Sequence, residues 1–215
     1  MGIRSGFALA GVALTVVLGA SGCVGSTPAP TVTVTVTPSA GPTPTPTPTV
    51  APTPTTAAFS ADDPGTWIID GAGIGPFVVG STLADIESQV PAAVETCRAG
   101  VDTYSLDGLG LTAVSGIDES DPSAPVQVVR MLRIDGYDPS APQPHTEKGI
   151  SLASSVDELL AAYPGIEQYS GKQGNAIYRL AEGSEYIHFE GSDDGGLSII
   201  SVTDSQQVGF EYCGA

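Results

Sequence analysis

Two stretches of this chain, "PFVVGSTLADIESQVP" at 76–91 and "GISLASSVDELLAAYP" at 149–164, align with each other without a gap. Both have apolar residues at helical spacing, and they end in Pro91 and Pro164, which close a helix. The apolar positions are Leu83, Ile86 and Val90 in the first copy and Val156, Leu159, Leu160 and Tyr163 in the second. An internal repeat constrains a fold because each copy builds the same unit. We therefore expect two short amphipathic helices in equivalent places.

Each predicted helix also begins with the same signal. A hydroxyl residue precedes an acid by three positions, Thr82 before Asp85 and Ser155 before Glu158. In a capping box the hydroxyl accepts a bond from the amide of the acid, and the acid lies near the positive end of the helix. The spacing predicts a capping box at both helix starts.

Strand-like segments separated by turn residues follow each predicted helix. The turns include "AEGS" at 181–184 and "GSDDGG" at 191–196, both typical of hairpins. The expected strands are 110–117 and 126–134 in the first copy and 176–180, 186–189 and 197–202 in the second. This order predicts an α+β fold made of two tandem helix-plus-antiparallel-meander repeats, 61–144 and 145–215, with the helices packed on one face of the sheet.

These stretches resemble the fold shared by β-lactamase inhibitor proteins and small outer-membrane assembly lipoproteins. They are more similar still to uncharacterised actinobacterial lipoproteins that open with the pattern GIGP...G.T..D. The matching residues are Gly73-Ile74-Gly75-Pro76, Gly80-Ser81-Thr82 and Asp85, with Ala153-Ser154-Ser155 and Glu158 in the second copy. The resemblance implies a protein-binding scaffold without catalytic machinery. It carries over no inhibitory contact residue.

The first 22 residues have the features of a lipoprotein signal peptide. Arg4 is their one charged residue, and Phe7–Leu18 is an apolar run shorter than the ~20 residues that span a bilayer. Ala20-Ser21-Gly22-Cys23 resembles the lipobox, whose cysteine receives a diacylglycerol and palmitate in bacterial lipoproteins. We expect Cys23 to anchor the protein to the extracytoplasmic face of the cell membrane. The alternative is an ordinary cleaved signal peptide followed by an unmodified cysteine.

Residues 23–60 combine Cys23 with a Thr/Pro-rich, uncharged linker. Proline lacks the amide that a sheet ladder needs, and it biases the preceding residue towards extended conformations. We expect a disordered, polyproline-II-like tether, with threonines that are plausible O-glycosylation sites. Either the tether is a spacer that lifts the folded domain through a wall layer, or it is a disordered tail whose length has no particular function.

The net charge of the chain argues against one class of partner. The formal net charge is −17, and all 24 acidic residues lie after position 61. Nucleic acid binding depends on basic contacts to phosphates, so a field of this sign argues against nucleic acid as a partner.

Cys97 and Cys213 are the two cysteines that remain once Cys23 is assigned to the lipid. An even pair in an exported domain usually forms a disulfide. The bond would join the end of the second repeat to the first. Two buried free thiols are the alternative.

Motifs for catalysis are scarce. His145 and His188 are the only histidines, and neither belongs to a metal-ligand pair. The sequence contains neither a nucleophile elbow nor a phosphate-binding loop. The acidic segments 118–121 and 192–194 are interpreted as solvated hairpin tips. We predict no catalytic residue, no metal and no cofactor, with a hydrolase that uses an unrecognised site as the less favoured alternative.

A binding function is the leading hypothesis. If the alternate residues of "YIHFE" at 186–190 meet the helices, then Tyr186 and His188 point to the open sheet face, with Arg179 beside them. Tyr and Arg are enriched in interface hot spots. The sequence thus predicts a non-enzymatic module that binds an unidentified protein or cell-envelope ligand. An inhibitor or regulator of an exported enzyme is the alternative.

Overall fold

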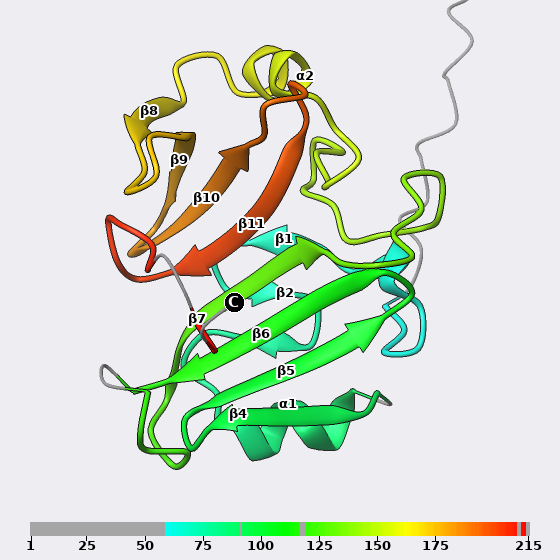
Figure 1. Cartoon of the computed structure of the whole chain (residues 1–215), viewed down its shortest axis with the longest axis vertical. Helices are drawn as coiled ribbons and strands as arrows, with labels where there is room; N and C mark the ends of the chain where they lie inside the picture. Colours follow the sequence, from blue (N-terminus) through cyan, green and yellow to red (C-terminus); the bar gives the residue numbers. More distant parts are fainter. Residues whose placement is uncertain (1–58, 91, 117–118, 210–211, 214–215) are drawn as a thin grey trace, which may run out of the picture. The chain divides into compact units, whose positions relative to one another are not determined.

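A computed structural model describes residues 59–90, 92–116, 119–209 and 212–213, which belong to one compact unit, Thr53–Ala215. An eight-stranded antiparallel sheet dominates it, in the order β4-β5-β6-β7-β11-β10-β9-β8 (Figure 1). The strands of the large sheet are β4 (Val94–Arg98), β5 (Val101–Leu106), β6 (Leu109–Ser115), β7 (Val126–Arg133), β8 (Glu167–Ser170), β9 (Ala176–Glu182), β10 (Glu185–Gly191) and β11 (Leu197–Thr203). Two meanders, β4 to β7 and β8 to β11, are joined where β7 pairs with β11.

A second, three-stranded sheet precedes the large one in the chain. It consists of β1 (Ile69–Asp70), β2 (Gly73–Ile74) and β3 (Phe77–Val78), after a short 3-10 turn at Pro64–Thr66. The β2–β3 turn contains Gly75, whose φ of +55° lies in the left-handed region. A Cβ on Gly75 would lie 2.5 Å from Cγ of Trp67, so this turn accepts only glycine.

The core lies between the two sheets. One face of the large sheet presents a row of directly paired, buried residues. The row consists of Tyr104, Leu111, Met131, Ile200, Phe189 and Tyr178, one from each of six neighbouring strands. Trp67, Ile69, Ile74 and Phe77 of the N-terminal segment are fully buried in the same core cluster. The rings of Phe77 and Tyr104 meet edge to face at 5.0 Å.

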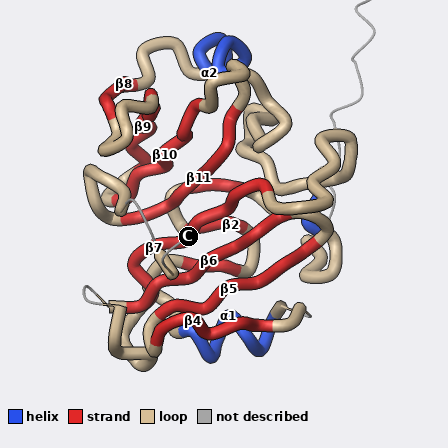
Figure 2. Tube along the Cα trace, in the orientation of Figure 1, coloured by secondary structure: helices blue, strands red, loops and turns tan. Residues whose placement is uncertain are grey.

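The two α-helices, α1 (Leu83–Gln89) and α2 (Val156–Ala162), have seven residues each. Both capping boxes are confirmed: Thr82 Oγ1 accepts the Asp85 amide at 3.2 Å, and Ser155 Oγ accepts the Glu158 amide at 3.2 Å. The helices lie at opposite ends of the large sheet (Figure 2). Among the described residues, no helix has the length and apolar character needed to cross a bilayer.

The predicted α+β class, with helices as the layer that covers the sheet, was wrong. The described chain is mostly antiparallel β-sheet, with eleven strands in two sheets and only two short helices. The helices bury just Leu83 and Ile86 of α1 and Leu159 of α2. The prediction failed because the layer that packs on the large sheet is largely β1 to β3 and their flanking loops, whose two-residue strands show no periodicity.

The hairpin strands were better predicted than the edge strands. The segments expected at 110–117, 126–134, 176–180, 186–189 and 197–202 correspond to β6, β7, β9, β10 and β11. Three strands of the large sheet were missed: β4, β5 and β8. β5 is an interior strand in which Val101, Asp102 and Tyr104 are buried. β4 and β8 form the two edges of the sheet, and most of their residues are exposed. An exposed edge needs no apolar alternation, so such strands leave little trace in a hydrophobic pattern.

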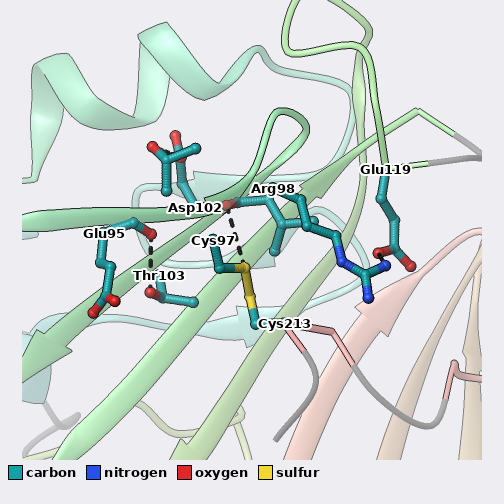
Figure 3. Close-up of a disulfide and its surroundings, with 9 residues drawn as sticks. Glu95, Cys97, Arg98, Asp102, Thr103, Glu119 and Cys213 are labelled. Carbon is teal, nitrogen blue, oxygen red and sulfur yellow. Dashed lines mark hydrogen bonds and ion pairs between the residues drawn. A yellow bond between two sulfur atoms is a disulfide. The ribbon is translucent and has the colours of Figure 1, made fainter.

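The predicted disulfide between Cys97 and Cys213 is present (Figure 3). It joins edge strand β4 to Cys213 near the C-terminal end of the chain, with the two Cα atoms 5.5 Å apart and a sequence separation of 116. Arg98 next to the bridge pairs with Glu119 at 2.7 Å. Cys23 and the predicted signal and linker segments lie outside the described residues.

Candidate functional site

A polar row crosses the face of the large sheet opposite the core. It consists of eight residues, each paired directly with the next on the neighbouring strand. From β4 to β8 they are Glu95, Thr103, Thr112, Arg130, Ser201, His188, Arg179 and Glu167. Direct partners in a sheet point to the same side, so the row occupies a single face. We call it the cross-sheet row.

Residues 204–209, which follow β11, cover the centre of this row. Nε2 of His188 lies 3.1 Å from the carbonyl oxygen of Ser205, and Nη1 of Arg179 donates to the carbonyl oxygen of Gln206 at 2.7 Å. His188 is fully buried as a result. The face that the sequence predicted to be open is therefore closed over His188.

His188 is held in one tautomer. The Ser205 carbonyl can only accept, so Nε2 carries the proton and Nδ1 of the neutral ring accepts from the Tyr169 hydroxyl at 3.0 Å. Desolvation lowers the pKa of His188 to about 4, with the Arg179 charge acting in the same direction. Both ring nitrogens are thus engaged in holding the C-terminal segment and β8.

Arg130, another member of the cross-sheet row, forms a buried ion pair with Glu190. Arg130 Nη2 is 3.5 Å from Glu190 Oε1, with only 11% and 10% of the two side chains exposed. Asn175 donates to the other Glu190 oxygen at 3.0 Å, and the Arg130 guanidinium lies 5.7 Å from the ring centre of Tyr212. Burial raises the pKa of Glu190, and the Arg130 charge opposes that shift. These contacts hold the C-terminal segment against the sheet.

The open site lies at the end of this face, where α2 leads into β8. A cleft of about 440 Å³ is found there, and we call it the α2–β8 groove. Its lining residues are Lys148, Tyr163, Pro164, Gly165, Ile166, Glu167, Arg179, Leu180, Ala181 and Tyr186. The lining combines an apolar floor with two tyrosines and two cations.

Aromatic rings hold both cations of the groove in place. Lys148 Nζ lies 4.4 Å from the ring centre of Tyr163 and donates to the Ala162 carbonyl oxygen at 2.7 Å. The Arg179 guanidinium lies 5.3 Å from the Tyr186 ring centre and 5.8 Å from that of Tyr169, and Nη2 pairs with Glu167 at 2.6 Å. Fixed side chains lose little entropy when a ligand binds.

Besides a small cavity of about 70 Å³ whose lining includes Tyr169, Lys172 and Glu190, two other clefts lie on the surface. One of about 540 Å³ has Asp70, Glu182 and Glu185 in its lining, and Glu182 accepts the Gly71 amide at 2.8 Å. Another, of about 330 Å³, includes the exposed side chains of Phe59 and Val78. Neither combines aromatic residues with cations as the α2–β8 groove does.

The predicted binding residues separate into two environments. Tyr186 and Arg179 line the α2–β8 groove, whereas His188 lies beneath the C-terminal segment. Tyr163 and Lys148 belong to the groove and were missed. Tyr163 was assigned to the apolar face of the second helix, and Lys148 lies in a loop without any pattern.

Within the described ranges, no three His, Cys, Asp or Glu side chains come together in a way that could hold a metal ion. In the predicted hairpin tip at 192–194, Asp194 accepts from the Ser192 hydroxyl and from the Gly196 amide, and lies 3.9 Å from Arg133. These bonds stabilise the β10–β11 turn.

No protein-family model matches the chain, and no curated protein matches it. Two solved structures are similar at low identity. A DUF4309 family protein, YjgB, from Bacillus subtilis is 11% identical with a TM-score of 0.42, over 66% of this chain and 94% of that one. A cysteine-rich secretory protein from Staphylococcus aureus is 10% identical with a TM-score of 0.36, over 61% of this chain and 44% of that one. This chain therefore spans less than half of the staphylococcal protein, and neither likeness bears on function.

Proposed function

We propose that this protein is a non-enzymatic, lipid-anchored binding module on the extracytoplasmic face of the cell membrane, and that the α2–β8 groove holds its ligand. The ligand is a segment of another protein or of the cell envelope. The observation that carries the proposal is the lining of the groove, where Tyr163, Tyr186, Arg179 and Lys148 surround an apolar floor.

The chemistry of this lining suits recognition. Tyrosine and arginine contribute a large share of the binding energy at protein interfaces, because they combine apolar area with a polar group at the tip. A volume of about 440 Å³ lies within the usual range of ligand clefts. The ring contacts of Lys148 and Arg179 preorganise the two cations.

The titratable groups favour binding over catalysis. A general base needs a pKa near the working pH and access to substrate. His188 is fully buried with its pKa lowered to about 4, and Glu167 in the groove pairs with Arg179 at 2.6 Å. The arrangement fits a protein whose polar groups hold its shape and its ligand.

Two features support the extracytoplasmic location. The Cys97–Cys213 disulfide suits an oxidising compartment, where such bonds persist. The lipobox-like residues before Cys23 supply the anchor, since diacylglycerol with a further acyl chain holds a domain firmly at a membrane.

Copurification from the native envelope tests the function. The full chain and its Tyr186→Ala, Tyr163→Ala and Tyr137→Ala variants would be crosslinked in the host, and the captured material quantified. Tyr137 is the matched control, because it too is partly buried and has a cation, Arg133, 5.2 Å from its ring centre. We expect Tyr186→Ala and Tyr163→Ala to lower recovery of the same partner, and Tyr137→Ala to preserve it. Equal recovery with all four proteins would contradict the proposal.

A further inference from the structure

The floor of the α2–β8 groove is an incompletely paired strand. Pairing of β8 with β9 begins at Glu167 opposite Arg179. β9 continues for three more residues, Leu180–Glu182, which pair with β10 on one side and with no β8 residue on the other. β8 is the short outermost strand, and the loop from α2 leads into it (Figure 2).

The groove lies along this incomplete edge. Leu180 and Ala181 of β9 line it, together with Tyr163–Glu167, the segment that joins α2 to β8. A strand edge without a partner presents backbone donors and acceptors on which another strand can form. Extended peptides bind in this way, with main-chain bonds that supply affinity and pockets that select alternate side chains.

Lys148 indicates that a ligand in the groove should carry an acidic side chain. Among the described residues, each arginine forms an ion pair with a carboxylate: Arg98 with Glu119, Arg130 with Glu190, Arg133 with Asp194 and Arg179 with Glu167. The described ion pairs do not include Lys148, whose ammonium is held by a carbonyl oxygen and the Tyr163 ring. The net charge of −17 repels an acidic ligand at long range, so the contact with this fixed cation is the attraction that a ligand carboxylate gains in the groove.

Two of the three acidic residues around the groove have partners within the protein. Glu167 pairs with Arg179, and Glu182 accepts the Gly71 amide. Glu147, next to Lys148 in sequence, is exposed to solvent as Lys148 is, so salt screens its repulsion of a bound acid and the attraction of Lys148 alike.

We propose that the groove takes an extended peptide segment of a partner protein, which adds as a strand beside Leu180–Glu182 of β9 and pairs an acidic side chain with Lys148. This inference rests on the proposed function and names its ligand class. Ala181 is exposed and small, so it leaves room for a larger side chain of the peptide on its face of the sheet. The preferred peptide contains β-branched or aromatic residues at alternate positions, one acid, and no proline where its amides bond to β9.

Selection of a displayed library of random octapeptides on the full chain tests this inference. Recovered peptides are expected to contain an acid within an alternating apolar pattern. Lys148→Gln is expected to weaken their binding about tenfold, the effect of losing one charge-assisted hydrogen bond. Lys172→Gln is the matched control, because Lys172 is also exposed and outside the described ion pairs but lies in the β8–β9 turn. The control is expected to leave affinity unchanged.

Two further comparisons make the result specific. Replacing the acid of a selected peptide by its amide should remove the difference between wild type and Lys148→Gln, because the pair is then already broken. Ala181→Trp, which fills the groove from an exposed position, should abolish binding while the melting temperature stays unchanged. Failure to select any peptide, equal effects of Lys148→Gln and Lys172→Gln, or full binding by Ala181→Trp would overturn the inference.

The experiments distinguish failure of the proposed binding function from failure of the strand-addition inference. If Tyr186→Ala and Tyr163→Ala lower capture of an envelope partner but no peptide strand is selected, the groove is a binding site and strand addition is wrong. If selected peptides bind, but Tyr186→Ala and Tyr163→Ala recover as much envelope partner as the wild type, then peptides do bind at β9. In that case the assignment of peptide binding as the function is wrong.

Discussion

Nε2 of His188 lies 3.1 Å from the carbonyl oxygen of Ser205. This bond holds the C-terminal segment over the cross-sheet row, and the Cys97–Cys213 disulfide ties the end of the segment to the opposite edge of the sheet. The central part of this sheet face is therefore covered by the protein's own C-terminal segment. The α2–β8 groove, at the end of that face, is left accessible to a ligand.

Burial of His188 makes stability depend on pH. Desolvation lowers its pKa from 6.5 to about 4, so between these values the unfolded chain binds more protons than the folded one. The contribution of His188 to the free energy of unfolding should therefore fall as pH drops through this window, by on the order of 3 kcal/mol in total. The raised pKa of Glu190 has the opposite effect, so the comparison with the His188→Gln variant isolates the histidine. Urea unfolding at a series of pH values from about 7.5 to 4.5 measures the slope; below that range, protonation of ordinary carboxylates adds to it.

His188→Gln should flatten this pH dependence, whereas His145→Gln should retain it. His145 is the only other histidine, and its Nδ1 contacts the Gln143 carbonyl oxygen at 3.2 Å in a partly buried position. An unchanged slope in His188→Gln would show that another group causes the pH dependence.

Loss of the disulfide should destabilise the protein strongly. The bond closes a loop across 116 positions, for which the chain-entropy model gives an upper value of about 4–5 kcal/mol. We expect the Cys97→Ser, Cys213→Ser double variant to unfold at lower urea concentration. It should also expose His188 to a histidine-specific reagent, because the covering segment is no longer tied. A double variant as stable as the wild type would contradict the assignment.

Alanine substitutions at two glycines distinguish the stability cost of a steric clash from the cost of a positive φ. Gly75 and Gly149 both have positive φ, +55° and +80°. A Cβ at Gly75 would clash with Trp67, whereas a Cβ at Gly149 meets nothing within 4 Å. Gly75→Ala should cost about 2–4 kcal/mol of stability, and Gly149→Ala only about 1 kcal/mol. Equal melting temperatures for the two variants would show that the Trp67 contact is unimportant.

Local signals in the sequence predicted local structure well. Thr82 with Asp85 and Ser155 with Glu158 form their capping boxes because all the atoms involved lie within one helical turn. The Cys97–Cys213 pair followed from the parity of the cysteines. In contrast, the short strands β1 to β3 and edge strand β8 depend on tertiary packing and leave no periodic pattern.

The candidate site was predicted in part, for a similar reason. Alternation along β9 and β10 placed Arg179 and Tyr186 on one face, and both line the groove. The same alternation could not reveal that a segment 17 positions beyond His188 would return to cover it. Nor could it bring Lys148 to Tyr163, because that contact joins a loop to the end of a helix.

Lipid attachment at Cys23 has a direct test. We expect the wild-type chain to incorporate labelled palmitate and remain with the membrane fraction, and Cys23→Ser to do neither. The Cys97→Ser, Cys213→Ser variant is the control, because it should still be labelled. Membrane retention of unlabelled Cys23→Ser would contradict lipid anchoring through this cysteine.

The most direct test of the binding account is site-specific photo-crosslinking from the groove in the native envelope. A photoreactive residue would be placed at position 181, on the floor of the α2–β8 groove, or at position 172, in the β8–β9 turn. The account predicts a discrete crosslinked partner from position 181 that disappears when Tyr186 is changed to alanine, and no such product from position 172. The same products from both positions, or none from position 181, would contradict it.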